Sequence, residues 1–366
     1  MLSLYIHIPF CVKKCLYCAF YSAVPSDERQ PDAYTDALIN EITASKTDDI
    51  VTSVYFGGGT PTFLGSARIG RIMNAVKGSF QLSDDCEVTL EANPATVTDG
   101  ETVRYRDIGF NRLSIGMQAL DDKTLRMIGR AHNYYDFISL YTQARKDGFK
   151  NISVDIMYGL PQQCTSEVLN AIIHVAELAP EHISLYGLML EEGTPMYEKK
   201  NEYVFPTEDE ELSMYIEGSR LLESNGYVHY EISNYAKPGF EARHNSRYWT
   251  RGDYLGFGTK AHSFYNNKRF SCDFDTDMFI EKAKEGTSVF ELTDFALQNV
   301  LGEEEAEQER IMLGLRMRKG VYLEGECAEK AQNYIRSKLM EYENGLFRLS
   351  DSGMYVSNTI IGDLLT

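Results

Sequence analysis

The feature that most constrains the fold is a regular alternation of short strand-like runs with longer amphipathic stretches, which continues from Leu2 to about Ile232. The runs are rich in β-branched and aromatic residues, and the stretches between them have the length of helices. Parallel strands joined by crossover helices produce this rhythm. The chain is therefore predicted to be an α/β protein with a barrel-like core.

The alternation places the individual elements of this core. The predicted strands are Leu2–Ile8, Ser53–Phe56, Glu87–Leu90, Arg112–Ile115, Ile152–Ile156, His182–Leu188 and Val228–Ile232. The predicted helices are Ala33–Ala44, Ser66–Phe80, Val97–Asp107, Ser166–Leu178 and Glu208–Asn225.

Two further parts are expected after this core. Beyond Asn234 the alternation gives way to an aromatic and glycine-rich segment, from His244 to Gly258, that has the pattern of neither helix nor strand. From about Glu303 the pattern predicts a small winged-helix-like α+β domain. Its second helix is expected near Ala328–Met340, and its two-stranded wing at Phe347–Leu349 and Met354–Val356. The predicted parts are thus residues 1–235, 236–300 and 301–366.

Composition limits the partners and the location. The 36 basic and 54 acidic residues give a net charge of -18, which repels phosphate backbones and anionic membrane surfaces. Nucleic acid is therefore not expected as a partner. No stretch approaches the roughly 18 apolar residues of a membrane-spanning helix, and the sequence opens on a strand-like run instead of a leader. We expect a cytoplasmic protein that is not an integral membrane protein.

The cysteines indicate a metal site. Cys11, Cys15 and Cys18 lie within one short stretch after the first predicted strand, where a loop can curl around a metal centre. The other four are scattered, which is not typical of a disulfide framework. They are Cys86, Cys164, Cys272 and Cys327.

Three thiolates suit a [4Fe-4S] cubane, because they leave one iron open for the amino and carboxylate groups of a small molecule. A zinc site with a remote fourth ligand and a reduced triad without metal are the alternatives.

Polar and glycine residues recur at the ends of the predicted strands, where an α/β barrel places its site. The run Gly57–Thr62 follows the second strand and offers backbone groups that a ligand can approach closely. Glu91, Gln118 and Asp155 follow or end the third, fourth and fifth strands. Singly, each of these is also explained as a tight turn or a cap. Arg130 suits a ligand carboxylate or is a surface cation.

The cysteine spacing, with the aromatic Tyr17 before the last cysteine, resembles the signature of radical S-adenosylmethionine (SAM) enzymes. The resemblance implies a partial (β/α)6 barrel, a [4Fe-4S] cluster on the three cysteines, and one-electron cleavage of bound SAM. Carried over position by position, it implies SAM contacts from a set of residues at the strand ends. These are Tyr5, Tyr17, Gly58, Gly59, Thr60, Glu91, Gln118, Arg130 and Asp155.

Within this family the chain resembles the oxygen-independent coproporphyrinogen III oxidase group, and two departures point to its relatives, the HemW-type heme chaperones. Phe20 occupies the position of a fourth cysteine of the oxidases, and Tyr5 stands almost at the start of the sequence, where the oxidases have an N-terminal extension. The run His244-Asn245-Ser246-Arg247-Tyr248-Trp249 matches the His-Asn-x-x-Tyr-Trp motif of the chaperones.

The resemblance implies heme or porphyrin as cargo, acceptor hemoproteins that include membrane-bound respiratory proteins, and a cytoplasmic electron donor. An imidazole among aromatic rings can ligate heme iron, which makes His244 the candidate ligand. The alternative is that His244 is a packed, hydrogen-bonded residue. No comparable context surrounds the other histidines, with the roles of His7 and His262 left open. Three functions thus remain: a heme chaperone, a coproporphyrinogen III oxidase, or a protein with a structural or redox-sensing cluster.

Overall fold

The computed structural model describes residues 1–284, 286–292 and 299–366. The chain forms two compact units that interleave in sequence. The first unit comprises Met1–Asp155, Met189–Glu202 and Gly252–Val300, and the second comprises Ile156–Leu188, Tyr203–Arg251 and Leu301–Thr366. This division follows other boundaries than the three predicted parts, whose status as domains stays a prediction.

A parallel sheet forms the centre of the first unit. Its strands are β1 (Leu2–Ile8), β2 (Ile50–Gly58), β3 (Gln81–Ala92) and β4 (Arg112–Gln118), which pair in that order. Every residue of β4 is buried, as expected for a parallel strand covered on both faces. The strands predicted from the alternation are confirmed here, and β1 matches its predicted bounds.

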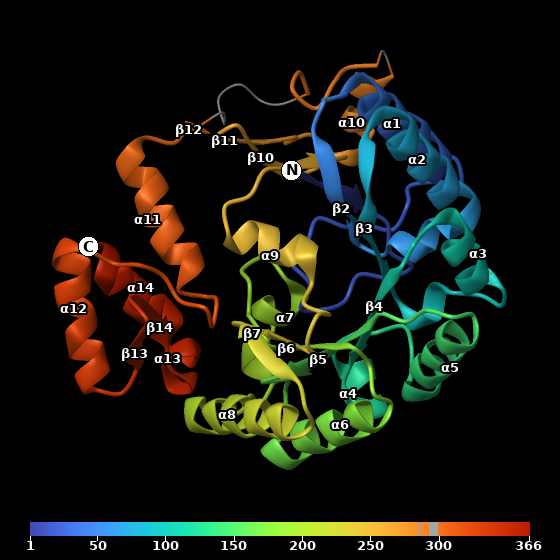
Figure 1. Ribbon diagram of the computed structural model, residues 1–366. Coiled ribbons are helices and arrows are strands. Elements are labelled where there is room, and N and C mark those ends of the chain that lie inside the picture. Colours follow the sequence, from blue (N-terminus) through green and yellow to red (C-terminus); the bar gives the residue numbers. More distant parts are fainter. Residues whose placement is uncertain (285, 293–298) are drawn as a thin grey trace. The chain divides into compact units, whose positions relative to one another are not determined.

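Helices connect these strands. The crossover helices α1 (Gln30–Ala44), α2 (Gly65–Ser79) and α3 (Glu101–Ile108) lie side by side along one face of the sheet (Figure 1). The first two begin close to the predicted positions, whereas α3 begins at Glu101 instead of Val97. The alternation missed two helices, α4 (Asp122–Met127) and α5 (Tyr134–Lys146).

The far edge of this sheet comes from late in the sequence. Strand β9 (Tyr254–Phe257) pairs in parallel with β1, and the antiparallel strands β10 (His262–Tyr265), β11 (Lys268–Ser271) and β12 (Asn299–Val300) continue outward. The short helices α7 (Pro195–Glu198) and α10 (Thr276–Ala283) also belong to this unit. The expectation of irregular backbone up to Gly258 is thus wrong for β9, because four residues are too few to show a strand period.

Strand β5 (Ile152–Tyr158) carries the chain from the first unit into the second. There, β6 (His182–Gly187), β8 (Asn234–Ala236) and β7 (Val228–Glu231) pair antiparallel in that order. The run Val228–Ile232 was expected to continue a parallel sheet. It instead pairs antiparallel with β8, and the turn between the two strands is too short to contain a crossover helix.

The helices of the second unit include α6 (Thr165–Glu177) and α8 (Glu208–Ser224), close to their predicted bounds. A capping box of Thr207 and Glu210 fixes the start of α8. Helix α9 (Arg243–Trp249) contains the His-Asn-x-x-Tyr-Trp run. The expectation that this run is neither helix nor strand is therefore wrong. Its seven residues are too few, and too uniformly polar or aromatic, to show a helical period.

The C-terminal part of the second unit contains helices α11 (Glu303–Gly314) and α12 (Gly325–Arg336), then the hairpin of β13 (Met340–Glu343) and β14 (Leu346–Leu349). Helices α13 (Asp351–Tyr355) and α14 (Ser357–Leu365) end the chain. Buried apolar side chains join these elements into one core.

One strand of the wing was predicted wrongly. Residues Met354 to Val356 lie at the end of α13 and after it, not in a strand. The helix starts where the Ser350 hydroxyl accepts a hydrogen bond from the Gly353 N–H, a local cap that favours helix over strand. The second wing strand is β13 instead.

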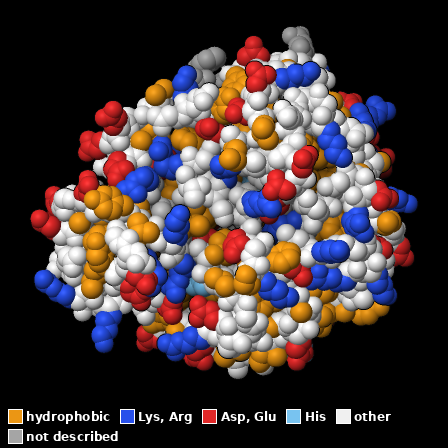
Figure 2. All heavy atoms as spheres, in the orientation of Figure 1, with side chains coloured by type: hydrophobic (Ala, Val, Ile, Leu, Met, Phe, Trp, Pro, Cys, Tyr) orange, Lys and Arg blue, Asp and Glu red, His pale blue; other side chains and the backbone are white. Residues whose placement is uncertain are grey.

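No helix in the described ranges combines the length and apolar composition needed to span a bilayer. On the face shown in Figure 2, basic and acidic side chains are interspersed.

Candidate cluster and cofactor site

The three predicted cluster cysteines lie on the loop that follows β1. The Cys11 N–H donates to the carbonyl of Ala23 (3.0 Å), and the Leu16 N–H donates to the carbonyl of Ile128 (3.0 Å). The Leu16 carbonyl in turn accepts from the N–H of Met196 (2.9 Å). The loop is thus fixed by backbone bonds to distant parts of the first unit.

The three cysteine side chains are free thiols. Cys11 is buried, and Cys15 and Cys18 are half-buried. The Cys11 sulfur lies 3.4 Å from the Thr60 hydroxyl, and the Arg130 guanidinium donates to the Cys15 sulfur (3.7 Å). Burial raises the pKa of the Cys11 and Cys18 thiols, so a bound cation is needed to hold them as thiolates at neutral pH.

The three free thiols on one loop are the ligand set that was expected for the cluster. The described residues contain no group of three or more His, Cys, Asp or Glu side chains arranged to hold one metal ion. Ligands of a mononuclear zinc must converge on one point, whereas three cysteines of a cubane each bind a different iron. The cluster is the centre that the resemblance implies, and the zinc alternative stays open.

The glycine run after β2 fits closely around the cysteine loop. A Cβ at Gly59 would lie 3.0 Å from the Cys11 sulfur and 2.9 Å from the Phe10 carbonyl oxygen. A Cβ at Gly58 would lie 2.6 Å from the His7 ring, and Gly58 has a φ of 116°. Only glycine is accommodated at these two positions without displacement. The run is thus a close backbone approach and not a plain turn.

Glu91 accepts two hydrogen bonds from the neighbouring strand. The Tyr55 hydroxyl donates to one carboxylate oxygen (2.7 Å) and the Gly58 N–H to the other (3.2 Å). Burial raises the pKa of Glu91 to about 7, and the negative charge of Asp155 adds to this shift. Glu91 is therefore able to gain or lose a proton near neutral pH.

A hydrogen-bonded chain links Tyr5 to the cysteine loop. The Tyr5 hydroxyl lies 3.1 Å from His7 Nδ1, and His7 Nε2 lies 3.0 Å from the Tyr21 carbonyl oxygen. Because that carbonyl can only accept, Nε2 carries the proton and Nδ1 accepts from Tyr5. Burial lowers the pKa of His7 to about 4, which keeps the ring neutral. His7 thus has a role in this site, which is to orient Tyr5.

Three more of the predicted residues contact β4. Gln118 has a φ of 69°, and its side chain and the guanidinium of Arg130 both lie over Gly116, where a Cβ would be 2.7 Å from each. Arg130 also donates to the Gly116 carbonyl (3.0 Å). The Ser114 hydroxyl donates to Asp155 (3.3 Å). Arg130 is therefore a fixed group beside the cysteine loop, not a surface cation.

Tyr17 lies close enough to Arg130 and Asp155 for the charge of each to act on its hydroxyl. Burial raises the pKa of its hydroxyl, and the nearby Arg130 charge opposes that shift, while Asp155 adds to it. All nine predicted SAM contacts thus belong to the first unit. Their role as SAM contacts stays a prediction.

Sequence reasoning missed Tyr55 and did not assign the steric roles of Gly57 and Gly116. Tyr55 pairs in register with Tyr5, and its hydroxyl donates to Glu91. Gly57 leaves room for the Tyr55 ring, since a Cβ at Gly57 would lie 2.9 Å from that ring. Gly116 makes room for Arg130. The glycines can be recognised in the sequence because they lie in or beside predicted strand ends. The partner of Glu91 cannot be recognised in this way, because it depends on the register between β2 and β3.

His244 lies in the second unit, on α9, and is 1% exposed. Its Nε2 lies 2.7 Å from the hydroxyl of Tyr248, one turn along the same helix. The two rings meet edge to face at 5.1 Å. His244 therefore has a packed, hydrogen-bonded environment, which is the alternative to a heme ligand, and its heme role stays a prediction.

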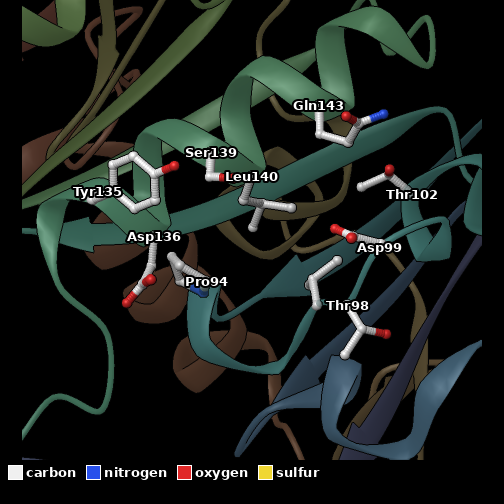
Figure 3. A pocket seen from close by; sticks show the side chains of 10 residues that line it. Pro94, Thr98, Asp99, Thr102, Tyr135, Asp136, Ser139, Leu140 and Gln143 are labelled. Atoms are coloured by element: carbon white, nitrogen blue, oxygen red, sulfur yellow. The ribbon is translucent and has the colours of Figure 1, made fainter.

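A cavity of about 130 Å³ lies elsewhere in the first unit, between the start of α5 and the segment before α3 (Figure 3). Polar side chains such as Asp99, Asp136 and Gln143 line it. It includes no cysteine and none of the predicted SAM contacts, so it is distinct from the candidate site.

The comparisons with known proteins agree with this geometry. The family model of the Radical SAM superfamily matches residues 5–201. The heme chaperone HemW of Lactococcus lactis is 31% identical over 99% of this chain and 97% of its own length, and that of Bacillus subtilis is 34% identical over 98% and 96%. The heme chaperone HemW of Escherichia coli is 38% identical over 71% of this chain and 69% of its own.

A solved structure shares the fold. Coproporphyrinogen III oxidase (HemN) from Escherichia coli, described as a radical SAM enzyme, superposes with a TM-score of 0.86. The match covers 100% of this chain and 90% of that one, at 24% identity. The predicted fold class is therefore confirmed. With the cysteine loop, the glycine run and the strand-end residues in place, the chain belongs to the radical SAM superfamily and, within it, to the HemW family.

Proposed function

We propose that this protein binds heme and delivers it to acceptor hemoproteins, including membrane-bound respiratory proteins reached from the cytoplasm. One observation carries the proposal: relatives named heme chaperones align with nearly the whole chain, including α9 with His244. The cargo and acceptors come to this chain from those relatives. The cytoplasmic location rests on the sequence alone.

The first unit would hold the cofactors of the family. Cys11, Cys15 and Cys18 would bind a [4Fe-4S] cluster, which when present supplies one electron to the sulfonium of SAM. Arg130 offers a fixed guanidinium beside Cys15 that suits the carboxylate of SAM. Glu91, with its pKa near 7, would accept from the amino group when ionised. The glycine run would let the ligand approach the backbone.

The second unit would supply the heme ligand. Ligation of iron by His244 Nε2 requires this atom to leave the Tyr248 hydroxyl, because one lone pair cannot serve both. The same helix carries Trp249, whose ring lies 5.7 Å from the Arg316 guanidinium. Both side chains are partly exposed, and an indole and a cation of this kind suit the apolar macrocycle and the propionates of heme.

The test is a heme titration of the iron-reconstituted protein under anaerobic conditions, followed by the Soret band. Wild type should saturate at a fixed stoichiometry, and His244→Ala should bind at least about tenfold more weakly, the loss of one coordination bond being worth more than about 1.4 kcal/mol. The exposed His174 provides the matched control, and His174→Ala should bind as wild type does. Iron content should be equal in all three.

An unchanged titration in His244→Ala would remove the ligand assignment, and no saturable binding in wild type would remove the chaperone function. The fold shared with HemN favours a second function, oxidative decarboxylation of coproporphyrinogen III. Incubation with SAM, dithionite and coproporphyrinogen III decides between them, since protoporphyrinogen IX would identify an oxidase. Retention of fold without SAM binding would instead support a structural or redox-sensing cluster.

A further inference from the structure

One face of the sheet in the first unit is lined by polar side chains. Successive residues of a strand point to opposite faces. In β4, one face receives Arg112, Ser114 and Gln118, and the other receives Leu113, Ile115 and Met117. In β3, Glu87, Thr89 and Glu91 alternate in the same way with Val88 and Leu90. Since Glu91 and Gln118 belong to the candidate site, the polar face is the one on which that site lies.

The register brings the polar rows of the two strands to the same face. Thr89 pairs with Arg112, and Glu91 pairs with Ser114. Paired residues of neighbouring strands point to the same side of a sheet, so Arg112 lies one side-chain position from the partner of Glu91. The Ser114 hydroxyl donates to Asp155 (3.3 Å), which brings a second carboxylate to this face.

Arg112 is a buried cation in this polar row. It is 2% exposed, and its Nε has no hydrogen-bond partner among the residues that the structure describes. A guanidinium stays protonated at any physiological pH. Burial of a charge without compensation costs free energy, so neighbouring carboxylates must offset it. Glu91 and Asp155 are carboxylates on the same face.

The charge of Arg112 acts on Glu91. Burial and the charge of Asp155 raise the pKa of Glu91, whereas the hydrogen bonds from Tyr55 and Gly58 and the charge of Arg112 lower it. Without Arg112, the two carboxylates would face each other with no cation from β4 between them. Arg112 therefore favours the ionised form of Glu91, which is the form that accepts a hydrogen bond from an amino group.

We propose that Arg112 is a positioning residue that keeps the Glu91 carboxylate ionised and in place for the amino group of SAM. Arg112 itself does not contact the ligand in this proposal, because it lies at the start of β4, whereas Gln118 ends that strand. The proposal rests on the proposed function through the SAM role of Glu91.

Two other titratable groups lie on the same face. Tyr5 on β1 feels the charge of Glu91, but burial raises the pKa of its hydroxyl, so it stays neutral near pH 7. Glu87 precedes Thr89 by two residues. If Arg112 served Glu87 alone, removal of its charge would leave Glu91 unchanged. Titration of Glu91 itself therefore tests the proposal.

The first experiment follows the Glu91 carboxyl by infrared difference spectroscopy in the iron-reconstituted protein without SAM. The band that disappears in Glu91→Gln identifies this group. Its titration midpoint should move upward by about one pH unit in Arg112→Gln and should stay within about half a unit of wild type in Arg112→Lys, which keeps the charge. Arg336→Gln makes the same charge change at an exposed position in the second unit and should have no effect.

The second experiment measures SAM binding by equilibrium dialysis on the same samples. At pH 7, Arg112→Gln should bind SAM about fivefold more weakly, because a smaller fraction of Glu91 is ionised, and at pH 8.5 the difference should fall below about twofold. In the Glu91→Gln background, Arg112→Gln should add less than about twofold, since the residue through which it acts is gone.

Stability keeps the test decisive if Arg112→Gln does not fold. Removal of the cation leaves an uncompensated carboxylate, so the double variant with Glu91→Gln should be more stable than Arg112→Gln alone at pH 8. A double variant that is no more stable would overturn the proposal, as would an unchanged Glu91 midpoint in a folded Arg112→Gln or an equal shift in Arg336→Gln. No SAM binding by wild type would contradict the SAM role of Glu91, whereas the infrared titration would still measure its coupling to Arg112.

Discussion

The candidate cluster site and the helix that carries His244 differ in how far each is prepared for its ligand. Around the cysteine loop, side chains from β1, β2, β3 and β4 are held by hydrogen bonds that span the sheet, such as Tyr55 to Glu91. His244 is held within one turn of its own helix, and its Nε2 is engaged by Tyr248. The first site is preorganised, whereas the second must open before it can ligate a metal.

The largest expected effect separates the two sites completely. Cys15→Ala removes one of three cluster ligands, so cluster assembly and SAM binding should be lost. Heme binding by the second unit should be retained, because His244 does not depend on that cysteine. Iron and sulfide analysis, SAM binding by equilibrium dialysis and a heme titration on the same sample test this. Cys164→Ala, at an exposed cysteine away from the loop, is the control.

If Cys15→Ala lost heme binding as well as iron, the two sites would not be independent, because the cluster would then be part of the heme site.

Each region also contains a buried glutamate, and these should titrate alike. Burial raises the pKa of both Glu91 and Glu231 to about 7. A pKa raised in the folded state means that stability is greatest below the unfolded pKa near 4.5 and falls as pH rises through 7. At pH values above the folded-state pKa, each glutamate should therefore lower the free energy of unfolding by roughly 3 kcal/mol compared with acidic pH. Urea unfolding at several pH values measures this.

Glu91→Gln and Glu231→Gln should each flatten that pH dependence, while only Glu91→Gln should weaken SAM binding. An identical effect of both variants on SAM would show that the second unit reaches the cofactor site.

The preorganisation of the first site should depend on its glycines. Gly59→Ala places a Cβ against the Cys11 sulfur and the Phe10 carbonyl, which should cost about 1–3 kcal/mol and lower cluster occupancy. Gly78 provides a control, since nothing lies within 4 Å of a Cβ there and it is in α2. Gly78→Ala should stabilise the protein by roughly 0.5–1 kcal/mol. Thermal unfolding and iron content check both variants.

A stable Gly59→Ala with full iron content would mean that the loop adapts and is less preorganised than its contacts indicate.

The smallest expected effect concerns the hydrogen bond between the Tyr248 hydroxyl and His244 Nε2. Tyr248→Phe removes the hydroxyl bound to Nε2 and keeps the ring, so heme should bind about fivefold more tightly, the equivalent of one hydrogen bond of about 1 kcal/mol. The heme titration described above measures it, with iron content as the control. Weaker binding would show that the Tyr248 hydroxyl contacts the heme instead of competing with it.

The same contrast explains what the sequence could predict. The cysteine loop, the glycine run and Glu91 are local patterns at strand ends, and the structure brings them together because parallel strands end at one edge. The partner of Glu91 and the room for Arg130 above Gly116 depend on register and could not be read from one strand. Strand β9 and helix α9 were missed because four and seven residues are too few for a period to emerge.

The interleaving of the two units has a consequence for biosynthesis. The cysteine loop is translated before two residues that hold it in place. Its Leu16 carbonyl accepts from the N–H of Met196, and its Tyr21 hydroxyl lies 3.3 Å from the hydroxyl of Thr276. Strand β9, which completes the sheet beside β1, is also translated late. A nascent chain therefore displays three reactive thiols long before the structure that shelters them is complete. The complete cysteine loop therefore forms only after most of the chain has been translated.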